Sequence, residues 1–225
     1  MPDRIALVRK RTALDLEIHE LSGRRLPDLA ALFGEGGDPK WCWCSFYRVR
    51  GPSWSFEPRA SRIGPNRAVM TEAVRTTAAV GRAPGLVAYR DGKAVGWVSL
   101  GPREDYDRLA HAKVLAPLDK RPVWSIVCFV VGKESRGQGI ARALLDAAVA
   151  YARDHGATLL EAYPIDPAEH RLSRPTKGGR VPAGYAYSGT VSMFERAGFK
   201  VVARRQFNKT TPVQPIVRRR IRRTG

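Results

Sequence analysis

The sequence predicts an α/β domain with a mixed sheet flanked by helices, and three observations support this class. A β-branched apolar run over residues 123–131 is followed by a glycine-containing turn and then by a helical segment from Ile140. Two further apolar runs, 86–90 and 93–100, flank an Asp-Gly pair, which favours a tight hairpin turn. Strand and helix patterns alternate along the rest of the chain, as is typical of a sheet covered by helices.

The first half of the chain supplies the first strand and two helices before the hairpin. Alternating apolar and polar residues over 14–21 predict the strand. Apolar residues at helical spacing over 24–33 predict a short helix, and Pro27 suits its first turn. Asn66 is suited to cap a second helix over 67–80, because its side-chain oxygen can accept from a free backbone N–H.

The second half of the chain alternates helices and strands. Residues 140–152 carry an apolar stripe at helical spacing and are followed by a glycine. Strands are predicted over 158–163 and 200–204, with a short helix over 190–197 between them. Residues 215–221 are predicted to form a final extended segment.

Length and composition predict one domain with extensions. The chain has 225 residues, of which 44% are hydrophobic, enough to bury a core. We assign residues 1–12 to a basic N-terminal extension, 13–205 to the domain and 206–225 to a basic C-terminal segment. No segment approaches the roughly 18 to 20 apolar residues of a membrane span, and no signal peptide is evident. The three cysteines do not suggest a disulfide framework. We therefore expect a cytoplasmic protein with no membrane partner.

The formal net charge of +18 is concentrated toward the C-terminus. Residues 204–223 hold eight Arg or Lys residues and no acid. Three interpretations remain open: a solvated tail, a docking segment for nucleic acid or the ribosome, and a positive field that attracts an anionic coenzyme. Charge alone does not choose among them.

Residues 136–141, Arg-Gly-Gln-Gly-Ile-Ala, are the most informative part of the chain. A strand that leads through glycines into a helix presents free backbone N–H groups at the positive end of the helix dipole, which suits a phosphate. The segment lacks the Lys-Ser/Thr of a Walker loop and the third glycine of a dinucleotide fingerprint. It resembles the acetyl-CoA loop of the GCN5-related N-acetyltransferases (the GNAT family), Arg/Gln-x-x-Gly-x-Gly/Ala, with Arg136, Gly139 and Ala141 at the matching positions.

A second segment strengthens the resemblance. Residues 192–199, Ser-Met-Phe-Glu-Arg-Ala-Gly-Phe, look like the Tyr-Glu-Lys-x-Gly-Phe segment that lies near the coenzyme thiol in that family. The resemblance covers about residues 14–205. It implies a GNAT-type mixed, mostly antiparallel sheet flanked by helices, with a splayed central pair of strands.

The resemblance also implies acetyl-CoA as co-substrate and a set of residues that bind it. The backbone of Phe129 and Val131 would contact the pantetheine and the thioester carbonyl, and the loop would hold the diphosphate. The implied coenzyme-binding residues are Phe129, Val131, Arg136, Gly137, Gln138, Gly139, Ile140, Ala141, Thr190 and Phe194.

The acid and the base are less well defined. The family often places a proton-donating tyrosine where this chain has Phe194. Tyr187 is our candidate donor, and water or a nearby hydroxyl is the alternative. Glu161 is our candidate general base if its side chain faces the cleft, where burial would raise its basicity. A solvent-facing Glu161 is equally consistent with strand alternation.

The aromatic segment that includes Trp41, Trp43 and Tyr47 has two interpretations. These residues line the acceptor site, because the loop after the first helix borders it in GNAT proteins, or they pack the core. A Cys-x-Cys pair lies in the same segment, but too few further ligands are available, so we predict no metal.

The resulting functional hypothesis is an N-acetyltransferase that moves an acetyl group from acetyl-CoA to a primary amine of a small molecule or peptide. In such an enzyme the amine attacks directly in a ternary complex, and positioning supplies much of the rate. One alternative is an acetyltransferase that docks on RNA or the ribosome through the basic tail. Another is a non-catalytic module that binds acyl-CoA. The hypothesis leaves a homodimer open.

Overall fold

The computed structural model describes residues 14–50, 58–169 and 187–222. The strands are β1 (Glu17–Glu20), β2 (Gly85–Arg90), β3 (Lys93–Pro102), β4 (Trp124–Val131), β5 (Leu159–Ala162), β6 (Lys200–Arg205) and β7 (Gln214–Arg220). The α-helices are α1 (Leu26–Gly34), α2 (Pro39–Cys42), α4 (Ile63–Ala78), α5 (Asp107–His111), α6 (Ile140–Asp154) and α9 (Val191–Glu195). Short 3₁₀ helices include η3 (Arg103–Asp105), η4 (Lys113–Leu115) and η5 (Lys133–Ser135).

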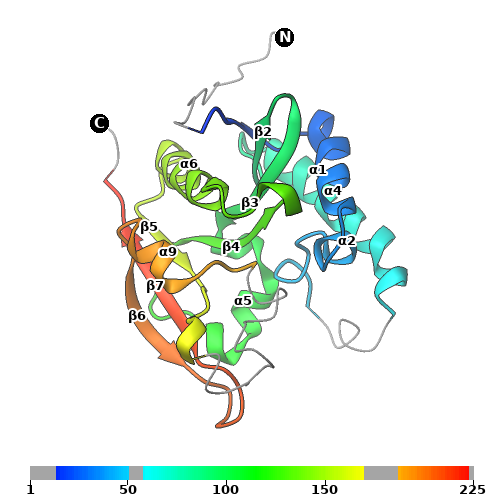
Figure 1. Ribbon diagram of the computed structural model, residues 1–225. Coiled ribbons are helices and arrows are strands. Elements are labelled where there is room, and N and C mark those ends of the chain that lie inside the picture. Colours follow the sequence, from blue (N-terminus) through cyan, green and yellow to red (C-terminus); the bar gives the residue numbers. More distant parts are fainter. Residues whose placement is uncertain (1–13, 51–57, 170–186, 223–225) are drawn as a thin grey trace.

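The seven strands form one sheet in the order β1-β2-β3-β4-β5-β7-β6. β4 and β5 run parallel, and the other neighbouring strands are antiparallel. The parallel pair needs a crossover connection, which α6 supplies. The predicted mixed, mostly antiparallel sheet flanked by helices is confirmed (Figure 1).

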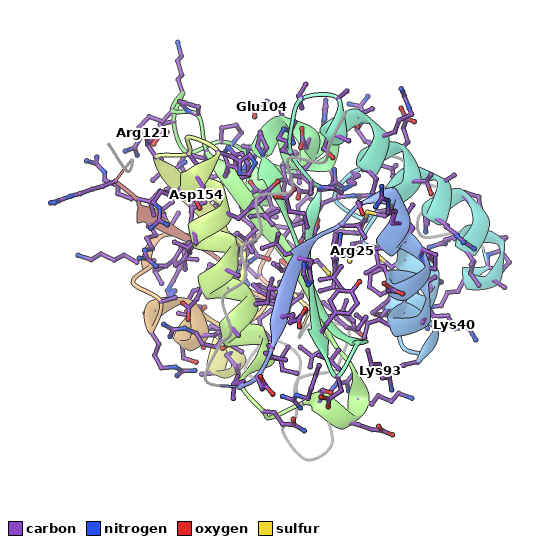
Figure 2. The ribbon with its side chains drawn as sticks, turned by 90° about the horizontal axis from the view of Figure 1, so that it is seen from above. Arg25, Lys40, Lys93, Glu104, Arg121 and Asp154 are labelled. Carbon is purple, nitrogen blue, oxygen red and sulfur yellow. The ribbon has the colours of Figure 1, made fainter. Side chains whose placement is uncertain are left out.

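Helices cover both faces of the sheet (Figure 2). The apolar stripe of α6, including Leu144 and Ala148, is fully buried against β2, β3 and β4. On the opposite face, α1 and α4 bury Phe33 and Met70 in a second cluster with Trp97 of β3. The sheet therefore lies between two apolar layers, and the hydrophobic effect fixes which face each helix covers.

The middle of β4 contains a β-bulge. Ser99 of β3 pairs with Cys128, but its neighbour Leu100 pairs with Ile126, so Val127 is the extra residue. A bulged strand bends and twists more strongly. β4 pairs with β5 along only three rungs, the last of which joins Ile126 to Ala162. The two central strands therefore part at the bulge, as the predicted splay requires.

Two local predictions need correction, the domain boundary at residue 205 and the capped start of the second helix. Residues 214–220 form β7 inside the sheet, between β5 and β6, so the sheet extends past the boundary predicted at residue 205. α4 begins at Ile63, and Asn66 does not cap it. Instead the Asn66 side chain is buried and donates to the carbonyl of Trp41, which ties α4 to α2. Between β3 and β4 the chain forms η3, α5 and η4, which cover the lower part of the second sheet face (Figure 1).

The packing of α6 on β3 depends on the glycine at position 96, which leaves room for side chains of α6. An added Cβ at Gly96 would lie 2.7 Å from Ile140 Cγ2 and 2.9 Å from Leu144 Cδ1. Gly96→Ala should therefore overpack this interface and lower the free energy of unfolding by about 1–3 kcal/mol in urea titration. Gly64→Ala is the control, because its Cβ meets no atom within 4 Å and alanine favours the helix. Equal stability of the two variants would contradict this description of the interface.

Candidate active site

The turn between β4 and α6 is open above its glycines. Gly137 and Gly139 have φ values of +76° and +79°, a left-handed conformation that glycine adopts without strain. Within residues 14–50, 58–169 and 187–222, no atom lies within 4 Å of a Cβ built on Gly137, and a Leu14 methyl lies 3.2 Å from that of Gly139. Residues 136–139 are exposed. A ligand can therefore approach this backbone closely.

The first turn of α6 begins without a side-chain cap. Its N-cap residue is Gly139, and among the residues that the structure describes no side-chain hydrogen bond caps this position. The amide groups and the helix dipole consequently favour an anion at this end. A contact with α1 fixes the start of this turn: the Glu35 carboxylate at the end of α1 accepts from the backbone N–H of Lys133 (3.1 Å).

Two side chains of the predicted loop make local contacts. Arg136 Nε donates to the carbonyl of Val131 (3.2 Å), which places its guanidinium beside the end of β4. Gln138 donates to the carbonyl of Glu134 (2.9 Å) and accepts from Arg90. Ile140, the first residue of α6, is buried, whereas Ala141 in the same turn is partly exposed. The structure thus brings together Arg136 to Ala141 around one end of α6.

The edge of β4 beyond the bulge does not pair with β5. On this edge the backbone N–H of Phe129 donates to the carbonyl of Tyr187 (2.6 Å). The carbonyl of Val131, two residues on, is the acceptor used by Arg136. Phe129 and Val131, the predicted backbone contacts, therefore lie on the edge of β4 that β5 leaves, and both are engaged by groups of the chain itself.

Comparison with known proteins agrees with this geometry. A family profile described as Acetyltransferase (GNAT) family matches residues 43–172, more than half of the chain. The chain belongs to the GNAT family of acetyltransferases. It is accordingly an acyltransferase, and acetyl-CoA is the co-substrate that this family uses. No curated protein matches the sequence significantly.

Solved GNAT structures share the fold. A PaiA N-acetyltransferase from Thermoplasma acidophilum, solved in complex with coenzyme A, aligns with 92% of this chain and 99% of its own, at 16% identity and a TM-score of 0.51. A ribosomal-protein-alanine N-acetyltransferase from Brucella melitensis aligns with 91% of this chain and 99% of its own, at 16% identity and a TM-score of 0.50. At these identities the likeness is one of fold.

Thr190 and Phe194, predicted near the coenzyme thiol, have structural contacts. The Thr190 hydroxyl caps α9 by accepting from the backbone N–H of Met193 (3.3 Å). Phe194 is fully buried and packs edge-to-face against Phe129 and Phe199, with ring centroids 6.1 and 5.0 Å apart. Phe194 therefore supports β4 from the core, and its ring presents no proton to a leaving group.

Tyr187 spans β4 and the connection between α1 and α2. Its carbonyl accepts from Phe129, while its hydroxyl lies 2.8 Å from a Cβ built on Gly37 and receives a backbone hydrogen bond from Asp38. Burial raises the pKa of the Tyr187 phenol, so the group keeps its proton at neutral pH. Its chemistry thus suits a proton donor.

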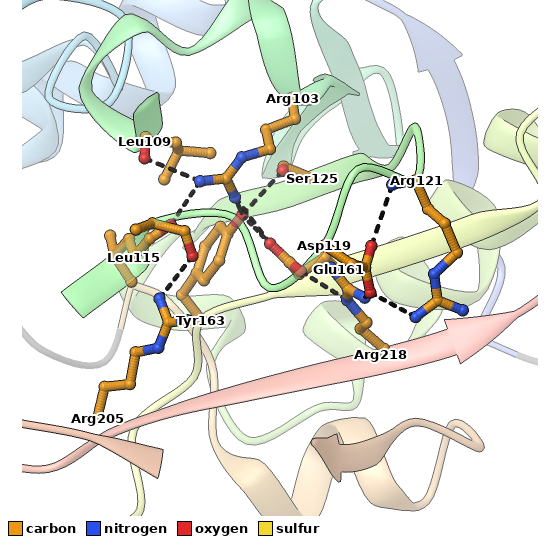
Figure 3. Close-up of polar contacts among 11 residues, drawn as sticks. Arg103, Leu109, Leu115, Asp119, Arg121, Ser125, Glu161, Tyr163, Arg205 and Arg218 are labelled. Atoms are coloured by element: carbon orange, nitrogen blue, oxygen red, sulfur yellow. Dashed lines mark hydrogen bonds and ion pairs between the residues drawn. The ribbon is translucent and has the colours of Figure 1, made fainter. Parts of the chain in front are cut away.

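Glu161 lies in a buried charge cluster rather than at the surface (Figure 3). Its Oε1 accepts from Arg103 Nη1 (2.8 Å) and from the Tyr163 hydroxyl (2.6 Å), and its Oε2 accepts from Arg218 Nε (2.7 Å). Ser125 of β4 completes the group at 3.1 Å from Tyr163. Because both carboxylate oxygens hold structural partners, this geometry does not support the predicted role of general base.

The cluster connects four parts of the fold. Arg103 also donates to the carbonyls of Leu109 and Leu115, which fixes α5 and η4 on the sheet. Arg218 of β7 reaches Asp119 as well (2.6 Å), and Arg121 binds the same carboxylate. These residues escaped sequence analysis because their partners are distant in the chain. The one feature of the sequence that could indicate the cluster is Glu161, the single acid in the otherwise apolar strand β5.

The aromatic segment packs mainly into the interior. Trp43 is buried edge-on against Phe33, with centroids 5.4 Å apart, and Tyr47 stacks on Tyr163. The core-packing interpretation therefore describes Trp43 and Tyr47. Trp41 is partly exposed, donates to Asp38 (3.2 Å) and lies beneath two arginine side chains.

The three cysteines remain free thiols. Cys44 donates to Cys128 with a sulfur–sulfur distance of 3.1 Å, and burial raises the pKa of Cys42 to about 12. Within residues 14–50, 58–169 and 187–222, no group of three or more His, Cys, Asp or Glu could hold a metal ion. In the same ranges, no helix is long and apolar enough to span a bilayer.

The charge cluster predicts a stability effect at Glu161. Glu161→Gln should lower the free energy of unfolding by about 3 kcal/mol, because the buried Arg103 guanidinium loses its counter-charge and Arg218 keeps only Asp119. Glu72→Gln is the control, since the Glu72–Arg75 pair is exposed and should contribute nothing measurable. Urea unfolding checks both variants. If Glu161→Gln kept full stability and lost only turnover, the general-base assignment would be correct after all.

Proposed function

We propose that the protein transfers the acetyl group of acetyl-CoA to a primary amine of a small molecule or peptide, by direct attack of the amine on the thioester. The observation that carries the proposal is the edge of β4 that leaves β5 beyond the bulge, beside the glycine-lined start of α6. Family membership gives the reaction class, and these features support the coenzyme site in this chain.

The residues of the loop fit the coenzyme. The amides of residues 137–141 would hold the diphosphate, with Arg136 and Lys133 adding positive charge nearby. The edge of β4 would align the pantetheine, and the Phe129 amide would hold the thioester carbonyl oxygen, where negative charge develops during attack. Acetyl-CoA supplies the activated acyl group. The protein positions it, which suits a mechanism without an acyl-enzyme.

Proton transfer is proposed to involve Tyr187 and no carboxylate base. The Tyr187 backbone carbonyl bonds to Phe129 on the β4 edge, and its hydroxyl, which lies at Asp38, is the proposed proton donor. Glu161 is committed to Arg103 and Arg218. An acceptor amine that is already unprotonated, or that loses its proton to water, then needs no protein base.

Docking on nucleic acid through the basic tail has less support. Arg218 is buried against Glu161, and Arg219 donates to the carbonyl of Ala197 (2.6 Å). Arg205 donates to the carbonyl of Ala116 (2.6 Å), and Arg204 pairs with Glu169 (3.3 Å). Four of the arginines counted in the tail thus make contacts within the fold. Lys209, Arg220 and Arg222 are exposed, a smaller basic set than the sequence suggested.

Calorimetry with acetyl-CoA, followed by thiol release across a panel of free amines, tests the proposal. Binding and amine-dependent thiol release are expected. Binding without thiol release from any amine would favour the non-catalytic module. Absence of binding by the unaltered protein and by its Gly189→Ala and Tyr187→Ala variants would refute the coenzyme site.

A charge placed at the start of α6 tests the diphosphate position. Ala141→Glu should weaken acetyl-CoA binding at least about tenfold relative to Ala141→Gln, because the two side chains match in size and only one repels an anion. Calorimetric dissociation constants for the two variants give the comparison. Equal constants would place the diphosphate elsewhere.

The pH dependence of turnover tests Tyr187. The raised pKa keeps the phenol protonated past its ordinary value of about 10, so activity should rise as the amine deprotonates and fall only at higher pH. Tyr187→Phe should lower kcat roughly 100-fold and remove the descending limb. A kcat like that of the unaltered enzyme would mean that water or another group supplies the proton.

A further inference from the structure

The space between the diverging strands is occupied by the chain itself. After β5, Ile165 forms a parallel bridge with Thr190: its N–H donates to the carbonyl of Gly189 (3.0 Å), and its carbonyl accepts from Val191 (2.9 Å). On the other side, the Tyr187 carbonyl accepts from the Phe129 amide. Residues 187–190, which we call the strap, therefore bond to both sides of the gap that opens beyond the bulge.

The strap is held by side-chain contacts as well. The Tyr187 ring packs against the apolar cluster beneath α1, and its hydroxyl is anchored at Asp38. Gly189 has a φ of +75°, and a Cβ there would lie 2.5 Å from the Met193 methyl and 3.1 Å from the Phe194 ring. Only glycine fits this position without strain or displacement.

The strap and the coenzyme would both need the backbone N–H of Phe129 as a hydrogen-bond donor. A backbone N–H has a single proton to donate, and that of Phe129 is committed to Tyr187 at 2.6 Å. Arg136 uses the Val131 carbonyl on the same edge. The diphosphate end of the site is open, whereas its thioester end is closed by contacts within the chain.

We propose that the strap is an autoinhibitory element that must detach from both β4 and Ile165 before acetyl-CoA can seat its thioester. This inference rests on the proposed function. The coenzyme binds the detached state, so its apparent affinity is lowered by the fraction of molecules in which the strap is open. Detachment frees the Tyr187 side chain to move.

Variants that loosen the strap should bind acetyl-CoA more tightly than the unaltered protein. Gly189→Ala strains the strap, and Tyr187→Ala removes its anchor, so each should lower the calorimetric dissociation constant about tenfold if the strap is open about a tenth of the time. Gly81→Ala is the matched control. Gly81 has a similar φ of +71°, but in the described part of the chain no atom lies within 4 Å of an added Cβ, so the affinity of this variant should not change.

Amide hydrogen exchange in the unaltered protein provides the second measurement. Acetyl-CoA should accelerate exchange at the Ile165 amide, which loses its acceptor on Gly189 when the strap leaves, although bound ligands normally slow exchange. The proposal requires both tighter binding by the variants and faster exchange at Ile165.

The outcomes separate the two proposals. Binding by the unaltered protein, with no gain in either variant or with slower or unchanged exchange at Ile165, overturns the strap and leaves the proposed function intact. Binding only by the variants supports both proposals and indicates a firmly closed strap. Absence of binding in all of the proteins overturns both.

Discussion

The β-bulge at Val127 inserts one unpaired residue into β4 opposite β3. β4 separates from β5 directly before this bulge, after Ile126. Parallel strands that stay paired leave no backbone group free for a ligand. Because the pair ends after three rungs, the far half of β4 keeps an edge, and the start of α6 lies at the end of that edge. The bulge therefore determines where a coenzyme could contact the backbone.

The charge cluster around Glu161 lies at the same point of the sheet. Glu161 and Ser125 occupy paired positions on β5 and β4, one rung before the strands separate. Arg103 brings the segment between β3 and β4 over them, and Arg218 adds β7 from the other side. A buried network of this kind costs desolvation, and its partners must all be present. We infer that it fixes the point of separation rather than performing chemistry.

Local patterns were enough to predict much of the fold. The hairpin, the helix after residue 139 and the strand that precedes it follow from turn chemistry and periodicity, which act over a few residues. The buried position of Glu161 could not be predicted, because the elements that cover it, α5 and η4, lie about 50 residues earlier in the chain. Arg218 looked like part of a charged tail because its acidic partner lies on another strand.

We propose that the edge of β4 and the start of α6 together form the coenzyme site. The most direct measurement is a crystal structure of the protein with coenzyme A. We expect the diphosphate against the amides of residues 137–141 and the pantetheine along β4 beyond Val127. Density for the coenzyme at any other surface, with the β4 edge unchanged, would contradict it.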